Sequence, residues 1–568
     1  AIRSSGHAFA HWSQTMQGYT GAWPLGLLPA GNPADMIAAV RGALSSIASQ
    51  TGAGSAVGVS TGDLRTGNGT NLFSATYNTA GWYGDVRAYT LNSNLSISTA
   101  PTWSASKYLN PTTLNASGSG NWSNRRILTF HDGLTASGTA DTDPLGRQGG
   151  DFQTSSSSGS LAFGTGFSAR QQDLLDRDPG SSLIDNRGPD RVNYLAGDNS
   201  NEGATGYNWR SRSVPRSLTL LDGTALTTPE GSLGDFINSS PLYVRYPSAT
   251  NVPAADYLTF KAYAAAVASR TPVLYAGGND GMLHAFDASD LSDNGGTTLG
   301  ATANSGKEVL AYVPAAVYSR LNQLTWTNYA HKYYVDGTPV AADAQLSSAT
   351  CTPSADATKC WRTIVTGGLN AGGQGIYAMN VTDPSTFASG AAKSLVLWEF
   401  NDRDDADLGY TFVQPIVRKM NNGKWAVIFG NGYNNTDSDG SVSTTGDAYL
   451  YILYIDGPGY AGTGRGQSWT LGTNYHKIRL PAPNAGAAPL SPANGLSTVF
   501  GIDKDSDNVV DYLYAGDRYG NVWKIDVSNT NPANWGSAFS SGSTPLPLFT
   551  AVTSDTLPLR EQITSSPI

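Results

Sequence analysis

Two stretches of the sequence, YAGGNDGMLHAFDAS (residues 275–289) and YAGDRYGNVWKIDVS (residues 514–528), match in frame and decide the expected fold. Each has apolar residues at alternate positions on both sides of a turn that contains Gly281 or Gly520. Alternation with a period of two on either side of a Gly turn is typical of a β-hairpin. The chain is therefore expected to repeat an antiparallel hairpin unit.

Weaker copies extend this pattern along the chain. A looser hairpin begins at Tyr77, and the second half of the unit recurs from Gly373 and from Gly446. Apolar runs that begin with Pro precede the hairpins, and a first strand tolerates Pro because its N–H need not pair; these prolines are Pro241, Pro339, Pro415 and Pro567. Final strands are expected at residues 395–400 and 476–480.

The repeated unit predicts the fold class. Four antiparallel strands recurring at intervals of roughly 45 to 80 residues indicate an all-β, modified β-propeller of about seven blades with long loop insertions. We expect the strands that begin with Pro to open the blades and the hairpins to occupy their middle. Residues 151–160, a Ser-rich stretch, are expected to form a mobile surface loop, and residues 190–198 a short helix.

Composition limits the partners. Charged residues make up only 14% of the 568 residues, against roughly 25% in soluble domains, and Gly is abundant. This composition is typical of a loop-rich, extracellular all-β protein. The formal net charge of −9 argues against nucleic acid and against an anionic membrane as partners, because both require basic patches. An apolar run long enough to span a membrane is not found in the sequence.

The beginning of the chain differs from the rest. Residues 32–50, NPADMIAAVRGALSSIASQ, open on Asn-Pro and space their apolar residues along one helix face. We therefore expect a short N-terminal helical segment at residues 1–55 and a propeller domain at residues 56–568. The chain starts with Ala and stops at an expected strand, so we expect a piece of a longer secreted protein. Its two cysteines, Cys351 and Cys360, predict a local disulfide.

The stretch DKDSDNVVD (residues 503–511) is the strongest site candidate. Counted from its first residue, the Asp side chains fall at positions 1, 3, 5 and 9, and a backbone carbonyl falls at position 7, as in an EF-hand loop. The predicted Ca²⁺ ligands are Asp503, Asp505, Asp507, the Val509 carbonyl and Asp511.

Two positions of this loop depart from the EF-hand pattern. Asn508 stands at position 6, where a positive φ normally requires Gly, and Asn tolerates that conformation next best. Tyr514 stands at position 12 in place of the bidentate Glu. We therefore expect water to complete the Ca²⁺ shell, with weaker affinity than in a buffering EF-hand.

The remaining candidates are weaker. Residues 401–409 and 434–440 are acidic but lack the register of the loop, so each is read as a solvated loop, with a weak ion site as the alternative. The six histidines never fall at zinc-ligand spacing. His284 lies inside a predicted strand and is expected to be a packed or surface residue. Residues 300–308 depart from a phosphate loop in spacing, and nucleophile motifs are missing, so no enzyme activity is expected.

These motifs together resemble a known family. LGDFINSSPLYV (residues 233–244), DLGYTFVQPIV (residues 407–417) and the C-terminal segment from DKDSDNVVD to KID resemble the C-terminal domain of the PilY family, the type IV pilus biogenesis and tip-associated adhesins. The resemblance covers about residues 71–568. It implies a modified propeller, a calcium loop whose ligands match the five residues above, and a preceding von Willebrand A-like domain, of which residues 1–55 would be the tail.

The resemblance also implies a role and a place. It implies control of pilus extension against retraction and of twitching motility, without chemistry. The expected partners are minor pilins at the type IV pilus tip, with host or abiotic surfaces as adhesion targets. The expected location is extracellular, at the cell surface or pilus tip, or associated with the outer membrane. An RGD tripeptide is absent, so integrin-type adhesion gains no support.

Two other classes stay open. Quinoprotein dehydrogenases are propellers with similar hairpins, but they need a vicinal Cys pair, whereas Cys351 and Cys360 lie apart. A carbohydrate-binding propeller adhesin would use exposed aromatic residues such as Trp82, Trp122 and Trp209. Absorbance from a bound quinone would identify the first class, and glycan binding the second.

Overall fold

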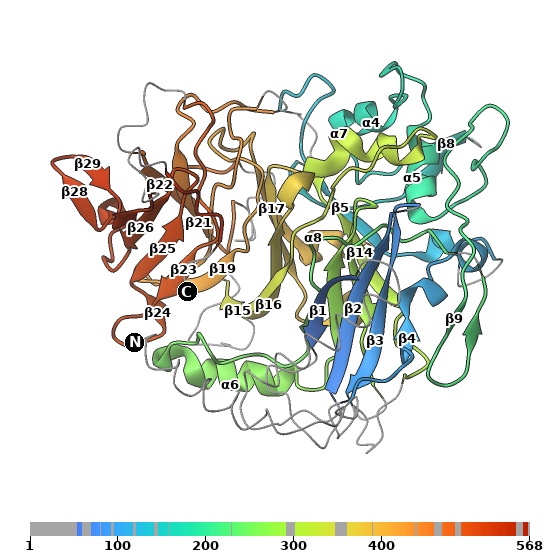
Figure 1. The fold of residues 1–568 in the computed structure, drawn as a ribbon, viewed down its shortest axis with the longest axis horizontal. Helices are drawn as coiled ribbons and strands as arrows, with labels where there is room; N and C mark the ends of the chain where they lie inside the picture. Colours follow the sequence, from blue (N-terminus) through green and yellow to red (C-terminus); the bar gives the residue numbers. More distant parts are fainter. Residues whose placement is uncertain are drawn as a thin grey trace, which may run out of the picture.

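The structure is a computed structural model of the chain. It describes residues 54–59, 70–79, 81–91, 96–116, 121–140, 146–157, 160–228, 230–290, 301–346, 360–388, 390–437, 440–458, 468–482, 490–552 and 560–565. In Figure 1 the first sheet (blue) lies to the right and the last (red) to the left, with α4, α5 and α7 along the upper edge and α6 along the lower edge.

Five sheets of four or more strands form the body of the described residues. The first contains β1 (Gly54–Val59), β2 (Thr70–Asn78), β3 (Tyr83–Leu91) and β4 (Trp103–Ser104). The second contains β11 (Leu242–Val244), β12 (Val273–Gly277), β13 (Leu283–Asp287), β14 (Glu308–Val313), β5 (Ile127–His131) and β6 (Gln148–Asp151). The third contains β15 (Val340–Gln345), β16 (Trp361–Gly368), β17 (Gly375–Asn380) and β18 (Val396–Asn401).

The last two sheets hold the acidic loop between them. The fourth contains β22 (Tyr475–Leu480), β21 (Ala448–Tyr454), β20 (Trp425–Gly430), β19 (Ile416–Met420) and β24 (Val509–Val510). The fifth contains β23 (Phe500–Ile502), β25 (Tyr512–Gly516), β26 (Asn521–Asp526) and β27 (Gly536–Ser537), with β30 (Phe549–Thr550) also paired to β26.

Smaller elements fill the loops. Three two-stranded sheets pair β7 (Thr154–Ser157) with β8 (Ser160–Phe163), β9 (Leu218–Thr219) with β10 (Ala225–Leu226), and β28 (Phe539–Ser541) with β29 (Thr544–Leu546). The α-helices are α3 (Pro111–Leu114), α4 (Ala169–Leu175), α5 (Gly188–Ala196), α6 (Tyr257–Ala266), α7 (Tyr318–Leu321) and α8 (Ala392–Leu395). Short 3₁₀ turns include η3 (Ala254–Asp256), which leads into α6.

The strand order confirms the repeated unit. The strands that follow Pro241, Pro339 and Pro415 are β11, β15 and β19, and each opens a run of four antiparallel strands. The predicted hairpins β12–β13 and β25–β26 occupy the middle of their sheets. Every residue of β12 and β13 is buried, because other parts of the chain cover both faces of the sheet. Pro567 lies outside the described residues.

Three expectations need correction or completion. The described residues hold five sheets of four or more strands, one of them with six, and the number of about seven blades stays a prediction. The Ser-rich stretch forms β7 and the start of β8 instead of a mobile loop, because Ser side chains tolerate an exposed hairpin. The helix expected at residues 190–198 is confirmed as α5, whereas residues 1–53 lie outside the described residues.

The predicted disulfide can be checked at Cys360, which is among the described residues. Cys360 is buried directly before β16, the second strand of the third sheet, and is disulfide-bonded. Cys351 lies outside the described residues.

Candidate metal centre

The acidic loop joins two antiparallel strands and touches a second sheet. It leaves β23 after Ile502 and enters β25 at Tyr512, and these two residues are paired across the strands. Between them, β24 runs parallel to β19, with Val509 opposite Lys419. The loop is thus fixed to the fifth sheet at both ends and to the fourth sheet near its second end.

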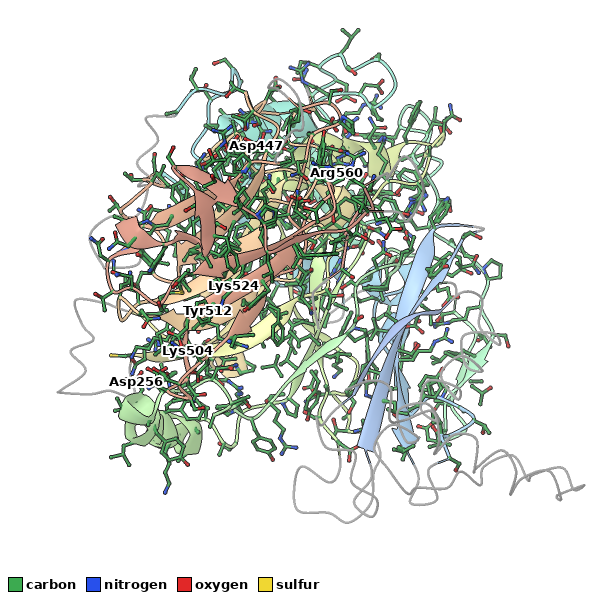
Figure 2. The ribbon with its side chains drawn as sticks, turned by 60° about the vertical axis from the view of Figure 1, so that its left-hand side comes forward. Asp256, Asp447, Lys504, Tyr512, Lys524 and Arg560 are labelled. Atoms are coloured by element: carbon green, nitrogen blue, oxygen red, sulfur yellow. The ribbon has the colours of Figure 1, made fainter. Side chains whose placement is uncertain are left out.

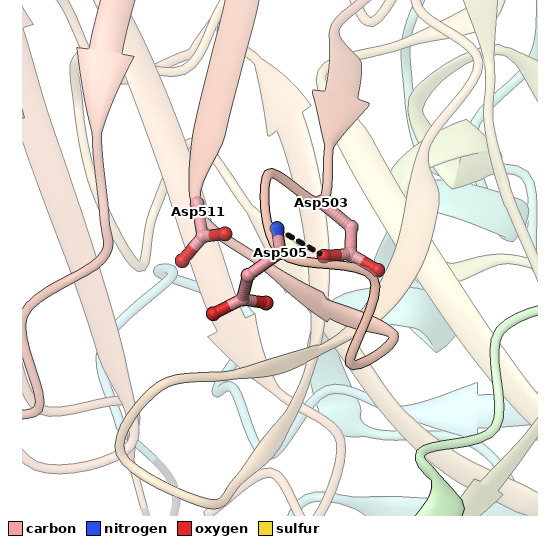
Figure 3. Close-up of side chains that lie close together, drawn as sticks. All are labelled: Asp503, Asp505 and Asp511. Atoms are coloured by element: carbon pink, nitrogen blue, oxygen red, sulfur yellow. Dashed lines mark hydrogen bonds between the residues drawn. The ribbon is translucent and has the colours of Figure 1, made fainter.

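Three of the predicted ligands come together. One carboxylate oxygen each of Asp503, Asp505 and Asp511 lies within 4.8 Å of the others, and Figure 3 shows the three side chains converging. Asp511 is buried, Asp503 is half-buried and Asp505 is exposed. Two oxygens on opposite sides of a Ca²⁺ ion at about 2.4 Å would be about 4.8 Å apart, so the spacing suits this ion. Among the described residues, no other group of three carboxylate, imidazole or thiol ligands is this compact.

Backbone hydrogen bonds shape the turn around Asp503. Its Oδ1 accepts the N–H groups of Asp505 (3.2 Å), Ser506 (2.7 Å) and Asp507 (3.3 Å), and its Oδ2 accepts that of Asn508 (2.7 Å). Asn508 has a φ of 65°, as its place in the loop predicted, and Ser506 has a φ of 66°, which the sequence did not indicate. The turn is held by the first carboxylate before any ion enters.

Asp511 and Asp507 are held differently. The Oδ2 of Asp511 accepts the Lys504 N–H at 2.9 Å, and its Oδ1 accepts the Asn421 side-chain amide at 3.3 Å. The Oδ1 of Asp507 accepts the Val509 N–H at 2.7 Å, and Asp507 is not in the compact group. Asn421, which no sequence motif indicated, also donates to the Val510 carbonyl at 2.9 Å.

The charges of the loop act on one another. Partial burial acts to raise the pKa of Asp503, but hydrogen bonds from four backbone N–H groups outweigh it, and that pKa is lowered from its usual value. Desolvation and the nearby Asp507 and Asp511 carboxylates raise the pKa of Asp505. A cation among these groups would remove the repulsion.

The loop also contacts the segment before α6. The Asn508 side-chain amide donates to the Val252 carbonyl at 2.9 Å, and Lys419 on β19 forms an ion pair of 2.5 Å with Asp256. Figure 2 shows Lys504 of the loop and Asp256 toward the lower left of that view, with Tyr512 and Lys524 above them. The Lys524 ammonium lies 3.9 Å from the centre of the Tyr512 ring. The end of the loop is therefore packed against the body of the protein through Asn508 and β24, whereas residues 504–507 are exposed.

The first of the other acidic stretches, residues 401–409, is used within the fold. The Lys477 ammonium lies 2.7 Å from Asp405 and 2.7 Å from Asp407, and Arg147 forms an ion pair with Asp404. These carboxylates belong to ion pairs and not to a solvated loop. In the second stretch, residues 438 and 439 lie outside the described residues.

Comparison with known proteins places the chain in a family. The family model described as "PilY1 beta-propeller domain" matches residues 233–567. The chain belongs to the PilY1 β-propeller family. The matched segment begins before β11 and includes the whole acidic loop.

Named relatives agree with this assignment. The type IV pilus biogenesis factor PilY1 of Pseudomonas aeruginosa (strain PAK) is 34% identical over 423 residues, covering 71% of this chain and 29% of the relative. A PilY1 homolog of Xylella fastidiosa (strain Temecula1) is 32% identical over 533 residues, covering 90% of this chain and 31% of the relative. The chain thus spans less than a third of either relative.

A solved structure of the family also matches the chain. The crystal structure of the Pseudomonas aeruginosa PilY1 C-terminal domain is 29% identical and covers 57% of this chain and 55% of its own, with a TM-score of 0.39. That score is too low for details of the fold to be inferred from it.

None of the helices in the described residues combines the length and apolar character needed to cross a membrane.

Proposed function

We propose that this chain is a calcium-binding, non-catalytic part of a type IV pilus biogenesis factor that supports pilus extension or opposes retraction. Membership of the PilY1 family supports the pilus role, since its relatives are named as pilus biogenesis factors. The convergence of Asp503, Asp505 and Asp511 supports calcium binding and is the single observation that carries the proposal. The proposed location is the cell surface or pilus tip, with minor pilins as partners and surfaces as adhesion targets.

The loop residues fit a hard divalent cation. Ca²⁺ prefers six to eight oxygen ligands and accepts flexible geometry. Asp503, Asp505 and Asp511 would supply carboxylate oxygens, and the remaining Asp507 oxygen, the Val509 carbonyl and water would complete the shell. The ion would neutralise carboxylates that now repel one another, and the chain itself would keep the turn closed through the four N–H bonds to Asp503.

The position of the loop suggests how the ion would act on the protein. β24, at the end of the loop, pairs with the fourth sheet, whereas β23 and β25 belong to the fifth. Calcium would therefore stabilise the junction between two sheets. A ligand changes a conformational equilibrium only if it binds one state better than the other. An open junction would hold the carboxylates apart and bind calcium weakly.

The first test concerns calcium and stability. At a concentration 100 times its dissociation constant, calcium should stabilise the wild-type fold by about 2.7 kcal/mol. Asp503→Asn and Asp511→Asn should remove this gain, measured as the difference in thermal midpoint with calcium and with EDTA. Glu561→Gln is the matched control, because it also removes one negative charge and the exposed Glu561 lies outside the loop. A calcium effect that survives in both loop variants would rule out this site.

The second test concerns the pilus. In the native organism, Asp503→Asn or Asp511→Asn in the full-length protein should reduce surface pili and twitching. Piliation should return when retraction is also disabled, because the proposed role is to oppose retraction. Piliation and twitching at wild-type levels, in variants shown to have lost calcium, would make the ion structural only.

The alternative functions receive less support from the described residues. Trp209 is buried, with 5% of its surface exposed, and packs edge-on against Tyr194. Trp82 packs against His331, with ring centres 4.0 Å apart and ring planes tilted by 34°. These tryptophans are used in packing, so they do not favour the carbohydrate-binding proposal.

A further inference from the structure

A cavity lies where the first strands of three sheets meet. It has a volume of about 480 Å³, and its wall includes residues of β11, β15 and β19. These three strands are neighbours, since β15 packs against both β11 and β19. The cavity is separate from the acidic loop, although Val252 in its wall accepts the hydrogen bond from Asn508.

The wall carries an excess of positive charge. Its charged residues are Arg245, Arg270, Arg418 and a single carboxylate, Asp343. That carboxylate already accepts hydrogen bonds from the Thr363 hydroxyl at 2.6 Å and the Ser248 N–H at 2.9 Å. The formal charge of the wall is therefore positive, whereas the chain as a whole carries −9. A positive cavity in an acidic protein favours a negatively charged ligand.

Two buried donors in this wall lack acceptors among the residues that the structure describes. They are the Nη2 of Arg270 and the indole Nε1 of Trp425. Arg270 is 9% exposed and Trp425 is 4% exposed. Buried donors are nearly always paired, because an unpaired one loses its bonds to water without replacement. Both need an acceptor from outside the described chain.

Arg418 adds a third underused donor group. The hydrogen bond that its guanidinium makes within the described residues is to the carbonyl of its own neighbour, Val417, at 3.0 Å. Burial lowers the pKa of Arg418. By contrast, Arg270 is anchored: its Nη1 donates to the Thr363 hydroxyl at 2.6 Å, and its Nε donates to the Arg245 carbonyl. One guanidinium is fixed in place and the other is free to adjust to a ligand.

We propose that this cavity binds a small molecule through an oxyanion group, a carboxylate or a sulfate. Guanidinium groups pair with such oxygens through parallel N–H bonds, and the indole N–H of Trp425 supplies a further donor. Apolar wall residues such as Val417 and Ala342 would contact the body of the ligand. The volume suits a compound of monosaccharide size. The inference goes beyond the pilus role and does not rest on calcium in the acidic loop.

The test uses sodium sulfate and sodium glucuronate as probes and glucose as the neutral control, with titration calorimetry on the whole chain in calcium buffer. At least one of the two anions should bind, and glucose should not. Arg418→Gln should weaken that binding at least 10-fold. Lys393→Gln, which removes an exposed positive charge on α8 outside the cavity, should leave it unchanged. Which anion binds identifies the group that the cavity accepts.

Trp425→Phe gives a second, independent readout. It removes the unpaired N–H together with the five-membered ring of the indole, so it should weaken anion binding several-fold, and the space left in the core should also lower the thermal midpoint without ligand. The proposal fails if neither anion binds at millimolar concentration, in about 20-fold excess over the protein. It also fails if Arg418→Gln and Trp425→Phe bind the anion as tightly as the wild type does. Equal stabilisation of wild type and Arg418→Gln by sulfate would likewise show a general salt effect only.

Discussion

Replacing Asp517 by alanine is expected to lower the free energy of unfolding by about 4 kcal/mol or more. The side chain is fully buried directly after β25. Its carboxylate accepts the backbone N–H groups of Tyr519 and Asn521, both at 2.9 Å, the side-chain amides of Asn494 (3.0 Å) and Asn521 (2.9 Å), and the indole N–H of Trp523 (2.9 Å). Alanine would leave these donors unpaired, except the Tyr519 N–H, which also donates to the Asn494 Oδ1 at 3.2 Å.

The change to asparagine separates charge from size. Asp517→Asn has nearly the same shape, but its amide nitrogen would face other N–H donors on whichever side it lies. We therefore expect a loss of at least about 2 kcal/mol. The control is Asp222→Ala, because Asp222 is exposed in a turn and its Oδ1 accepts the Thr224 N–H at 2.9 Å. Thermal and denaturant unfolding would measure each loss. A loss at Asp517→Ala no larger than at Asp222→Ala would contradict this account.

Asp517 also shows what the sequence repeat encodes. It occupies the fourth position of YAGDRYG, where the matching copy YAGGNDG has Gly278. The turn glycines predicted from these copies, Gly281 and Gly520, have φ values of 94° and 79°, so the sequence predicted both turns correctly. The bracing differs between copies: Asp517 braces one turn, and Asp280, hydrogen-bonded to His284, braces the other. The local pattern predicts the hairpin but not the polar contacts that fix it.

The sequence did not predict which strands pair when they lie far apart along the chain. β14 pairs in parallel with β5, whose residues lie 184 positions earlier, and β24 joins β19 across 90 positions. Neither pairing leaves a local signal, because both depend on where distant segments meet. These additions enlarge two sheets and explain why repeated motifs do not convert simply into a number of blades.

The candidate site was predicted more fully than its surroundings. The register of the loop identified Asp503, Asp505 and Asp511, which converge, and the positive φ of Asn508. The register also predicted Asp507 as an equal ligand. In the structure, Asp507 instead accepts a hydrogen bond from the Val509 N–H and lies outside the compact group. Spacing along a chain predicts which residues can meet, and backbone bonds decide how each side chain turns.

A buried ion network around His284 gives the second large effect, a fall in stability at alkaline pH. His284 is fully buried on β13. Its Nδ1 lies 2.8 Å from Glu308 and its Nε2 lies 3.1 Å from Asp280. Arg125 also pairs with Glu308, at 2.6 Å. Burial acts to lower the pKa of His284, but Asp280 and Glu308 outweigh it and raise that pKa from 6.5 to about 9.

The direction of the pH effect follows from this shift. The folded protein holds the imidazole proton more tightly than the unfolded chain does, so the stabilisation is complete below pH 6.5 and is lost as the pH rises through 9. The change amounts to about 3 kcal/mol. The lowered pKa values of Asp280 and Glu308 act only at acidic pH. Burial raises the pKa of Glu399 to about 8, so this residue also reduces stability as the pH rises, but mainly below pH 8.

Comparison with His284→Gln isolates the contribution of the imidazole. Glutamine cannot take up a proton, so the difference in unfolding free energy between wild type and variant should shrink by about 3 kcal/mol between pH 6.5 and pH 9.5. His476→Gln is the matched control, because partial burial and Lys424 lower the pKa of His476, and its effect should not change above pH 8. Denaturant unfolding at several pH values would measure both. If the difference in unfolding free energy between wild type and His284→Gln stays constant across this range, His284 is neutral in the folded protein. Arg125 and backbone N–H groups would then stabilise Asp280 and Glu308 without a charged imidazole.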